Sequence, residues 1–367
     1  MSFPVSTYTA RLDAVARLLA EQELAAAVLT PGPDLRFLLD SDLETHERFA
    51  ALVVTPTARR IVVPGVDAAD LRDGVAGEAG VEVVAWNDGE DPLSLLGIPT
   101  DATVAVSATM TADHLLNLQA RGVATVNATA VLREVFMVKD PAETAELARA
   151  GAALDAVHRR VPSLLRAGRT ESEVAGDLTA LILEEHVSVD FVIVGSGPHG
   201  ADPHHSFSGR VLADGDVVVV DIGGTLDSGY HSDCTRTYVL GEASEAQQDA
   251  YRVLRTAQEA GLAAARPGVT ATGLDAVVRD VVDAAGYGEF FTHRTGHGIG
   301  VSGHEEPFII AGNDTVLTEG MAFSVEPGIY VPGQWGARIE DIVVLTADGC
   351  EPLNTTTHDL VAVEVPA

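Results

Sequence analysis

The stretch that decides the fold is residues 217–237, which read VVVVDIGGTLDSGYHSDCTRT. Four consecutive valines predict a strand buried on both faces, and Asp221 follows them directly. A second β-type run begins after Asp233. A hairpin joining the two runs would bring Asp221 and Asp233 close together on adjacent strands. Neighbouring carboxylates repel and raise each other's pKa, and a bound cation removes that cost, so the pair predicts a metal site.

A second pair of carboxylates follows further along the chain. Glu326 ends the β-type run Ala322–Val325, and Glu340 lies at the start of the next strand, Ile339–Leu345. The Gly- and Pro-rich turn between them predicts a second hairpin that faces the first. His297 adds a nitrogen ligand from a loop flanked by glycines, where the backbone can approach closely. This oxygen-rich set suits two hard or borderline divalent cations, so the sequence predicts a two-metal hydrolase.

Composition excludes several other classes of protein. The formal net charge of −31 disfavours nucleic acid and anionic membranes as partners. Lys139 is the single lysine, which excludes a Walker-type phosphate loop and a Schiff-base lysine in the motif region. Cys234 and Cys350 predict ordinary reduced thiols. We expect a cytoplasmic protein, because the sequence shows neither a signal-peptide pattern nor an apolar run of about 20 residues.

The pattern of helices and strands predicts two domains. Short β-like runs alternate with helical stretches over residues 1–133, beginning with an amphipathic helix at 8–22, which indicates a small α/β domain with a partly parallel sheet. Asp140-Pro141 predicts a helix start, with helical stretches to about Leu165 and over 171–185. Strands and helices then come in blocks, so residues 140–367 predict an α+β domain.

Together these motifs resemble those of the pita-bread metallopeptidases, in the branch of Xaa-Pro dipeptidases (prolidases) and Xaa-Pro aminopeptidases. The motifs are D-I-G-G from Asp221, G-Y-x-S-D-x-T-R-T from Gly229, G-H-G-I-G-x-x-x-H-E from Gly296, V-E-P-G from Val325 and R-I-E-D from Arg338. The resemblance covers the whole chain. It implies an α+β pita-bread catalytic domain preceded by a smaller creatinase-like α/β domain.

The spacing departs from the family pattern at one place. Asp221 and Asp233 are twelve positions apart, where the family has one residue fewer. The extra residue fits a bulge or a longer turn within Thr225–Ser228.

The resemblance also implies a role for each site residue. Asp221 would bind one metal, Asp233 and Glu340 would bridge both metals, and His297 and Glu326 would bind the other. Glu326 would in addition be the general base. His204 would steady the scissile carbonyl oxygen, with His205 as the alternative if the register differs by one. His304 and His293 would line the substrate site and move protons, and Arg338 would orient Glu340 or the substrate.

The implied cofactor is a pair of divalent ions, with Mn²⁺ favoured and Co²⁺ or Zn²⁺ as alternatives. The implied substrate is a small peptide with proline at the second position, and the implied assembly is a homodimer. Dipeptidase and aminopeptidase activity both remain open. The rival readings are a hydrolase of a non-peptide amide or C–N bond and, because every ligand is intact, a less favoured non-catalytic binding module.

Overall fold

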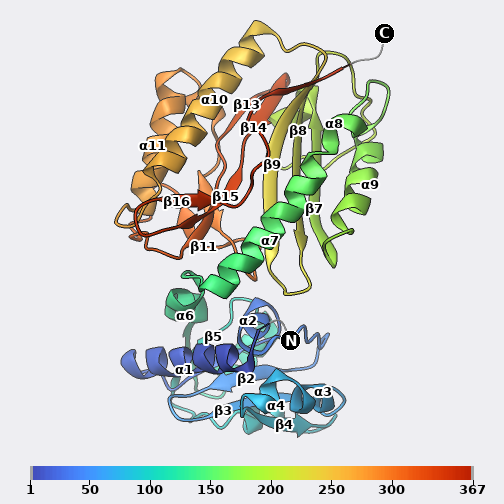
Figure 1. The fold of residues 1–367 in the computed structure, drawn as a ribbon. Helices are drawn as coiled ribbons and strands as arrows, with labels where there is room; N and C mark the ends of the chain where they lie inside the picture. Colours follow the sequence, from blue (N-terminus) through green and yellow to red (C-terminus); the bar gives the residue numbers. More distant parts are fainter. Residues whose placement is uncertain (1–2, 365–367) are drawn as a thin grey trace. The chain divides into compact units, whose positions relative to one another are not determined.

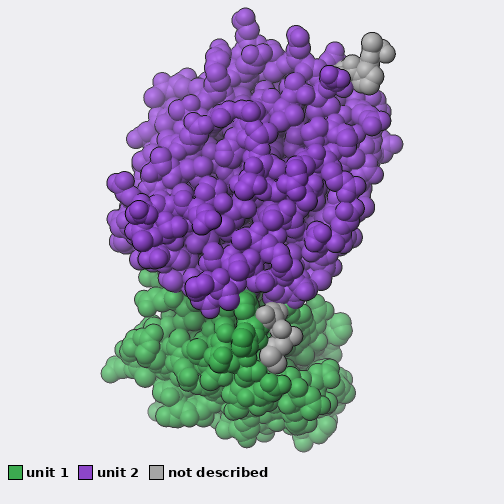
Figure 2. Space-filling model, in the orientation of Figure 1, with its two compact units in different colours: residues 1–136 green, residues 137–367 purple. Residues whose placement is uncertain are grey.

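The computed structural model describes residues 3–364. The chain divides into two compact units, Met1–Phe136 and Met137–Ala367 (Figure 2). Within the described range, every helix is too short or too polar to cross a membrane.

The first unit is built on one six-stranded sheet in the order β4-β3-β2-β1-β5-β6. As predicted, the sheet is partly parallel: β5 pairs parallel with β1 and β6, and β2 pairs antiparallel with β1 and β3. The predicted amphipathic helix is α1 (Val5–Glu21), which buries Leu12, Val15, Leu18 and Leu19. The other elements are β1 (Ala26–Leu29), α2 (Pro33–Leu39), β2 (Ala51–Val54), β3 (Arg59–Pro64), α3 (Ala68–Asp73), α4 (Val75–Glu78), β4 (Glu82–Trp86), η1 (Pro92–Leu95), β5 (Thr103–Val106), α5 (Ala112–Gln119), β6 (Ala124–Asn127) and α6 (Ala128–Phe136).

The second unit contains two larger sheets and a separate hairpin. One sheet has the order β17-β9-β8-β7, the other has the order β11-β10-β12-β15-β16, and β13 pairs with β14 alone. The strands are β7 (Ser188–Ser196), β8 (Val217–Thr225), β9 (His231–Leu240), β10 (Gly296–Gly298), β11 (Glu305–Ile309), β12 (Ala322–Val325), β13 (Gly328–Val331), β14 (Trp335–Arg338), β15 (Asp341–Leu345), β16 (Cys350–Pro352) and β17 (Val361–Val363).

Five helices flank these sheets: α7 (Pro141–His158), α8 (Val161–Leu164), α9 (Glu171–Ile182), α10 (Glu245–Ala264) and α11 (Ala271–Ala284). Short helical turns occur at η2 (Gly197–Ala201) and η3 (Gly288–Phe290). Asp140 caps α7 through a capping box, which fits the predicted start at Pro141. The predicted helical stretch to about Leu165 is interrupted at Arg159 and Arg160, between α7 and α8. Pro162 has no N–H and its ring clashes with the carbonyl four residues earlier, and α7 ends at that residue, His158.

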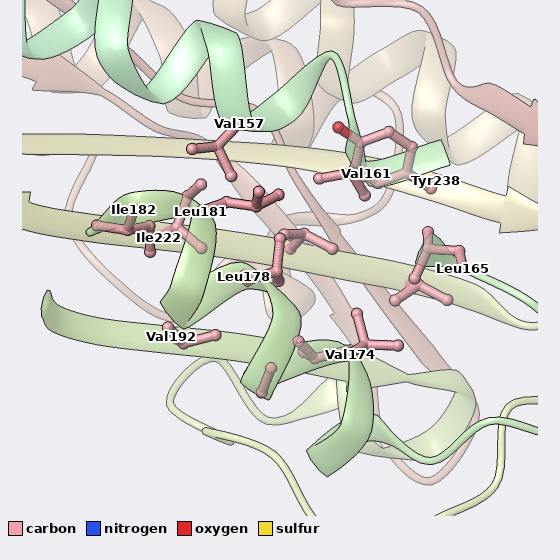
Figure 3. Close-up of a cluster of buried hydrophobic side chains, with 14 of the residues drawn as sticks. Val157, Val161, Leu165, Val174, Leu178, Leu181, Ile182, Val192, Ile222 and Tyr238 are labelled. Carbon is pink, nitrogen blue, oxygen red and sulfur yellow. The ribbon is translucent and has the colours of Figure 1, made fainter. Parts of the chain in front are cut away.

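The packing of α7 and α9 on the first sheet fixes which face carries the functional residues. Val157, Leu178 and Val192 belong to a cluster of buried side chains that joins these helices to β7–β9 (Figure 3). On β8, Val220 and Ile222 belong to this cluster as well. Because side chains alternate along a strand, Asp221 projects from the opposite face of the sheet.

The helices α10 and α11 close the other side of the unit. Figure 1 shows them across the strands from α7, α8 and α9. Leu254 of α10 and Val278 of α11 share a buried cluster with Ile329 and Ala337 of the β13–β14 hairpin. The two groups of helices thus enclose the strands from which the predicted metal ligands project.

Candidate metal centre

The two aspartates lie on the hairpin that the sequence predicts. In the antiparallel pairing of β8 and β9, Asp221 lies opposite Thr235, and Gly223 lies opposite Asp233. The aspartates are therefore diagonal neighbours on one face of the sheet. Each is almost fully buried, with 6% exposure for Asp221 and 5% for Asp233.

The turn of this hairpin contains the extra residue. Strand pairing continues without a shift as far as Thr225 and His231, and the Leu226 N–H donates to the carbonyl of Tyr230 at 2.9 Å. Three residues remain at the tip, ending in Gly229 with a φ of 83°. The longer spacing is thus taken up by the turn, without a bulge between the two aspartates.

His297 lies in a strand, although its flanking glycines predicted a loop. It is the central residue of β10, which pairs with β11 and β12. A Cβ at Gly296 would overlap the carbonyl oxygen of Ser324, and one at Gly298 would overlap the carbonyl oxygen of Glu306. The flanking glycines therefore allow the neighbouring chains to approach the histidine closely.

Glu326 and Glu340 lie at matching ends of a second pair of strands. Glu326 follows β12 directly and Glu340 precedes β15, with Val325 paired to Asp341. The predicted start of the strand Ile339–Leu345 is two residues early, because β15 begins at Asp341. The segment between the two glutamates forms the β13–β14 hairpin. Its glycines and prolines had predicted only a turn. This inserted hairpin carries Arg338.

The structure brings the five predicted ligands into one cluster. Ligand atoms of Asp221, Asp233 and Glu340 all lie within 4.8 Å of one another, as do those of His297, Glu326 and Glu340. The Nε2 atom of His297 lies 3.3 Å from Glu326 Oε1 and 3.6 Å from Asp233 Oδ2. Because Glu340 belongs to both groups, its carboxylate lies where a ligand shared by two ions would have to be.

The neutral form of His297 also fits a cation in this cluster. Its Nδ1 lies 3.0 Å from the carbonyl oxygen of Gly298, which can only accept, so Nδ1 carries the proton. Burial lowers the pKa of His297 to about 3. The neutral ring therefore presents the lone pair of Nε2 to two carboxylates, an arrangement that a cation between them would stabilise.

The carboxylates of this cluster also indicate a cation site. Among residues 3–364, the buried atoms Asp221 Oδ1, Asp233 Oδ1 and Glu340 Oε1 have no hydrogen-bond partner. Burial, together with neighbouring carboxylates, raises the pKa of Asp233 and of Glu340 well above the usual range. Burial also raises the pKa of Glu326 to about 7, although Arg338 opposes the shift. Unpaired buried oxygens are costly, so these residues fit divalent ions.

Arg338 links two of the ligands, Asp221 and Glu340, through hydrogen bonds. It is 4% exposed, and it donates from Nη2 to Asp221 Oδ2 at 2.6 Å and from Nε to Thr235 Oγ1 at 3.0 Å. The Thr235 hydroxyl donates to Glu340 Oε2 at 2.8 Å. The hydroxyl of Tyr330 accepts from Arg338 Nη1 at 2.6 Å. Arg338 thus orients Asp221 directly and Glu340 through Thr235.

His293 extends this network. Its Nδ1 donates to the carbonyl of Arg294 at 2.7 Å, and its Nε2 accepts from the Tyr330 hydroxyl at 2.8 Å. Burial and the Arg338 charge lower the pKa of His293 to about 4, which fits this neutral form.

His304 lies against the metal ligands. Its ring centroid is 3.7 Å from that of His297, and a ligand atom of His304 groups with those of Asp233 and His297 within 4.8 Å. Burial and the Arg294 guanidinium lower the pKa of His304, and Arg294 Nη2 lies 3.1 Å from its Nδ1. A neutral His304 therefore accepts from Arg294 at Nδ1, which leaves Nε2 to carry its proton.

His204 and His205 occupy the loop after η2. His204 is exposed, and its electrostatic interaction with His293 and His304 adds to the effect of burial in lowering the pKa of both. His204 therefore lies near both of these histidines. His205 has a partner in Glu171, with 2.9 Å between its Nε2 and Glu171 Oε2.

Comparison with known proteins agrees with this geometry. Residues 145–347 match the family described as Metallopeptidase family M24, and residues 11–138 match the Creatinase/Prolidase N-terminal domain. The chain belongs to metallopeptidase family M24. The predicted fold, a pita-bread domain preceded by a creatinase-like domain, is confirmed.

Relatives within family M24 cover the full length of the chain. It is 52% identical to the "Probable dipeptidase PepE" of Mycobacterium tuberculosis, over 99% of this chain and 98% of the relative. It is 33% identical to the "Xaa-Pro dipeptidase" of Lactobacillus helveticus, over 95% and 98%. The crystal structure of dipeptidase PepE from Mycobacterium ulcerans aligns with a TM-score of 0.96 at 52% identity, covering 99% of this chain and 100% of that chain. This chain is therefore an M24 metallopeptidase of the dipeptidase and prolidase group, a family that uses divalent metal.

Three residues around this M24 centre were missed by the sequence analysis. Thr235 lies two positions after Asp233 on one strand, so strand alternation could have placed it on the metal face. Ser324 lies two positions before Glu326, in β12, and its hydroxyl donates to Glu326 Oε1 at 2.9 Å. Tyr330 could not be predicted as a site residue, because the Gly- and Pro-rich sequence around it indicated a turn.

Proposed function

We propose that the protein is a dinuclear metal-dependent exopeptidase that hydrolyses the Xaa-Pro bond at the N-terminus of dipeptides or short peptides. The observation that carries the proposal is the lone pair of His297 Nε2, which faces Glu326 and Asp233 beside three unpaired buried carboxylate oxygens. The substrate class rests on the similarity to proteins named Xaa-Pro dipeptidase.

In this proposal the five ligands would divide between two ions. Asp221 would hold one ion, His297 and Glu326 the other, and Asp233 and Glu340 would be shared. The preponderance of carboxylates with one imidazole favours Mn²⁺, with Co²⁺ or Zn²⁺ as alternatives. When bound, two such ions supply a water that is acidic near neutral pH and polarise the scissile carbonyl.

Glu326 is the residue suited to move the proton. Burial raises the pKa of its carboxyl to about 7 before any cation binds, and Ser324 holds its Oε1. A carboxylate fixed in this way can take a proton from the attacking water and deliver it to the proline nitrogen, which leaves as an amine.

The other residues orient ligands and substrate. Arg338 is almost fully buried with its donors on Asp221, Thr235 and Tyr330, so we assign it the orientation of the ligands. His204 is exposed and close to His293 and His304, and it can donate to the carbonyl oxygen as negative charge develops there. His304, held by Arg294, and His293 would complete the substrate side of the centre.

We also propose a homodimer in the cytoplasm. Two free cysteines, Cys234 and Cys350, support a reducing compartment. Analytical ultracentrifugation of the purified protein tests the oligomeric state.

The deciding experiment is removal and readdition of metal. The purified chain is stripped with a chelator, dialysed, reloaded with Mn²⁺, Co²⁺ or Zn²⁺, and assayed on a Xaa-Pro dipeptide and a Xaa-Pro-Yaa tripeptide. We expect two bound ions per chain and activity only after reloading. Cleavage of the dipeptide alone would identify a strict dipeptidase. Failure to cleave either peptide with two ions bound would refute the proposed specificity and favour hydrolysis of a non-peptide amide or C–N bond.

A further inference from the structure

A second cluster of a carboxylate and imidazoles lies outside the metal centre, around Glu171. This glutamate is the first residue of α9, and its side chain is 0% exposed. Its Oε1 accepts from the backbone N–H of Ser196 at 2.9 Å and from the Ser196 hydroxyl at 2.6 Å. Its Oε2 accepts from the Ser208 hydroxyl at 2.7 Å and from His205 Nε2 at 2.9 Å. His199 Nδ1 lies 3.1 Å from each oxygen.

All of these donors come from one segment, residues 196–208, and that segment contains His204. Ser196 ends β7, His199 lies in η2, and His205 and Ser208 lie in the irregular loop that follows. Residues 202–208 belong to no strand. The backbone N–H groups of Val194 and Ser172 donate to the carbonyls of Ser206 and Ser208, and Glu171 supplies the acceptor for the side chains of His205 and Ser208.

The segment is also fixed on its other side. A Cβ at Gly336 would overlap the carbonyl oxygen of Gly200, so η2 lies directly against β14, the strand that ends at Arg338. The loop is thus held between Glu171 and the strand that leads to the metal ligands. A change at Glu171 would be transmitted to His204 through its neighbour His205.

Both oxygens of Glu171 accept hydrogen bonds, whereas one buried oxygen each of Asp221, Asp233 and Glu340 at the metal centre accepts none. A carboxylate can only accept, so His205 and His199 both donate to Glu171, and each oxygen of Glu171 has several donors. Burial would raise the pKa of Glu171, but the hydrogen bonds from Ser196, His205 and Ser208 outweigh burial and lower it to about 2. The three side chains could group around a cation, since their ligand atoms lie within 4.8 Å of one another. However, Glu171 has no oxygen left without a donor.

We propose that Glu171 is a positioning residue for His204, which it fixes beside the metal centre by binding His205, His199, Ser196 and Ser208. The proposal rests on the catalytic role of His204 proposed above. It assigns to Glu171 no contact with substrate or metal.

The test compares Glu171→Gln with Glu173→Gln in the metal-loaded protein. Glu173 lies two residues further along α9 and caps the same helix end by accepting from Thr170, without touching residues 196–208. We expect Glu171→Gln to lower kcat by about 10- to 100-fold, because a small misplacement of a catalytic group has costs of that size. KM and metal content should stay unchanged, and Glu173→Gln should match the wild type.

The variant His204→Ala separates positioning from general damage. If Glu171 acts through His204, then Glu171→Gln should lower kcat by less than about 2-fold in a His204→Ala background, as expected for two residues acting as one unit. Equal losses in both backgrounds would overturn the proposal. A lost equivalent of metal in Glu171→Gln would also overturn it and would identify a third metal site.

A second measurement does not depend on activity. Hydrogen exchange should show faster exchange over residues 197–208 in Glu171→Gln, with α9 and β8 still protected. If this variant does not fold, His205→Phe removes the link next to His204 and takes its place. Unchanged exchange in the loop refutes positioning, whereas a wild-type protein that cleaves no Xaa-Pro peptide refutes only the proposed function.

Discussion

Two clusters in the second unit contain the same chemical groups, carboxylates and imidazoles, but differ in how these groups are hydrogen-bonded. Around Glu171, imidazole and hydroxyl hydrogens point at the carboxylate, and both of its oxygens have partners. Around Glu340, one buried oxygen of each of three carboxylates lacks a partner, and the imidazole of His297 presents a lone pair. The first cluster is complete as a protein structure. In the second cluster, the donors Arg338 and Thr235 leave three buried carboxylate oxygens unpaired. The number of hydrogen-bond donors therefore distinguishes a cluster that is complete from one that fits a cation.

The largest effect should follow from Glu326→Gln, which removes the proposed base and keeps the shape of the side chain. We expect kcat to fall by more than about 1,000-fold, in the upper range for loss of acid–base catalysis. Circular dichroism and the melting temperature of the metal-loaded protein should show a retained fold. Activity within tenfold of the wild type would remove Glu326 from the role of base.

Arg338→Met should have the next largest effect, on stability. The substitution leaves Asp221 buried without its cation, and losing one partner of a buried ion pair costs about 3–5 kcal/mol. Urea unfolding of the metal-free protein should show this loss. The loss should shrink when metal is bound, because the ion then neutralises Asp221. Equal losses with and without metal would contradict the assignment of Asp221 as a ligand.

The pH dependence of stability should have opposite signs in the two clusters. Burial raises the pKa of Glu326 to about 7, so the folded metal-free chain holds a proton that the unfolded chain releases near pH 4.5. The melting temperature of the metal-free protein should therefore fall as pH rises through this window. Bound metal should offset the fall, so the difference between the two forms should grow with pH.

For Glu171 we expect the opposite pH dependence of stability, at pH values below about 4.5. Its pKa of about 2 in the folded protein means that its contribution to stability is present above pH 4.5 and is lost as pH falls toward 2. Thermal melts of Glu171→Gln and the wild type should therefore converge in acid. A constant difference between them would show that Glu171 is not ionised in the folded protein.

The smallest effect should come from Ser208→Ala. One of several donors to Glu171 is removed, and the others remain, so we expect a loss of about 1 kcal/mol in the free energy of unfolding. Ser172→Ala is a matched control, since the Ser172 hydroxyl is exposed and donates to the backbone of Ser208. A loss above about 3 kcal/mol would mean that Glu171 does not compensate for the missing donor.

The sequence predicted those parts of the centre that local patterns encode. Four valines and an aspartate define β8, and alternation along β8 and β9 is sufficient to put Asp221 and Asp233 on one face. The strand β10 was not predictable, because three residues with two glycines have no measurable periodicity and their partners lie in β11 and β12. The β13–β14 hairpin was read as a turn for a related reason, since glycine and proline dominate it.

The role of Glu171 was not predictable from the sequence, for a different reason. Its sequence context, Thr170 followed by a charged helix start, indicates only a capped helix. Its donors lie 25 to 37 positions away along the chain, in a loop whose path no local pattern determines. Three-dimensional proximity alone reveals the cluster.

The three-residue tip of the β8–β9 hairpin has a consequence for sequence variation. The spacing between Asp221 and Asp233 is fixed by paired strands up to Leu226 and Tyr230, both of which are buried. Only the tip, which includes the exposed Asp227, is outside that pairing. The tip is held by α7 instead, since Arg149 Nη2 lies 2.6 Å from Asp227 Oδ1 and Ser228 is buried. A change of length at the tip would therefore cost the contact with Arg149, whereas the paired strands would keep the two aspartates in register.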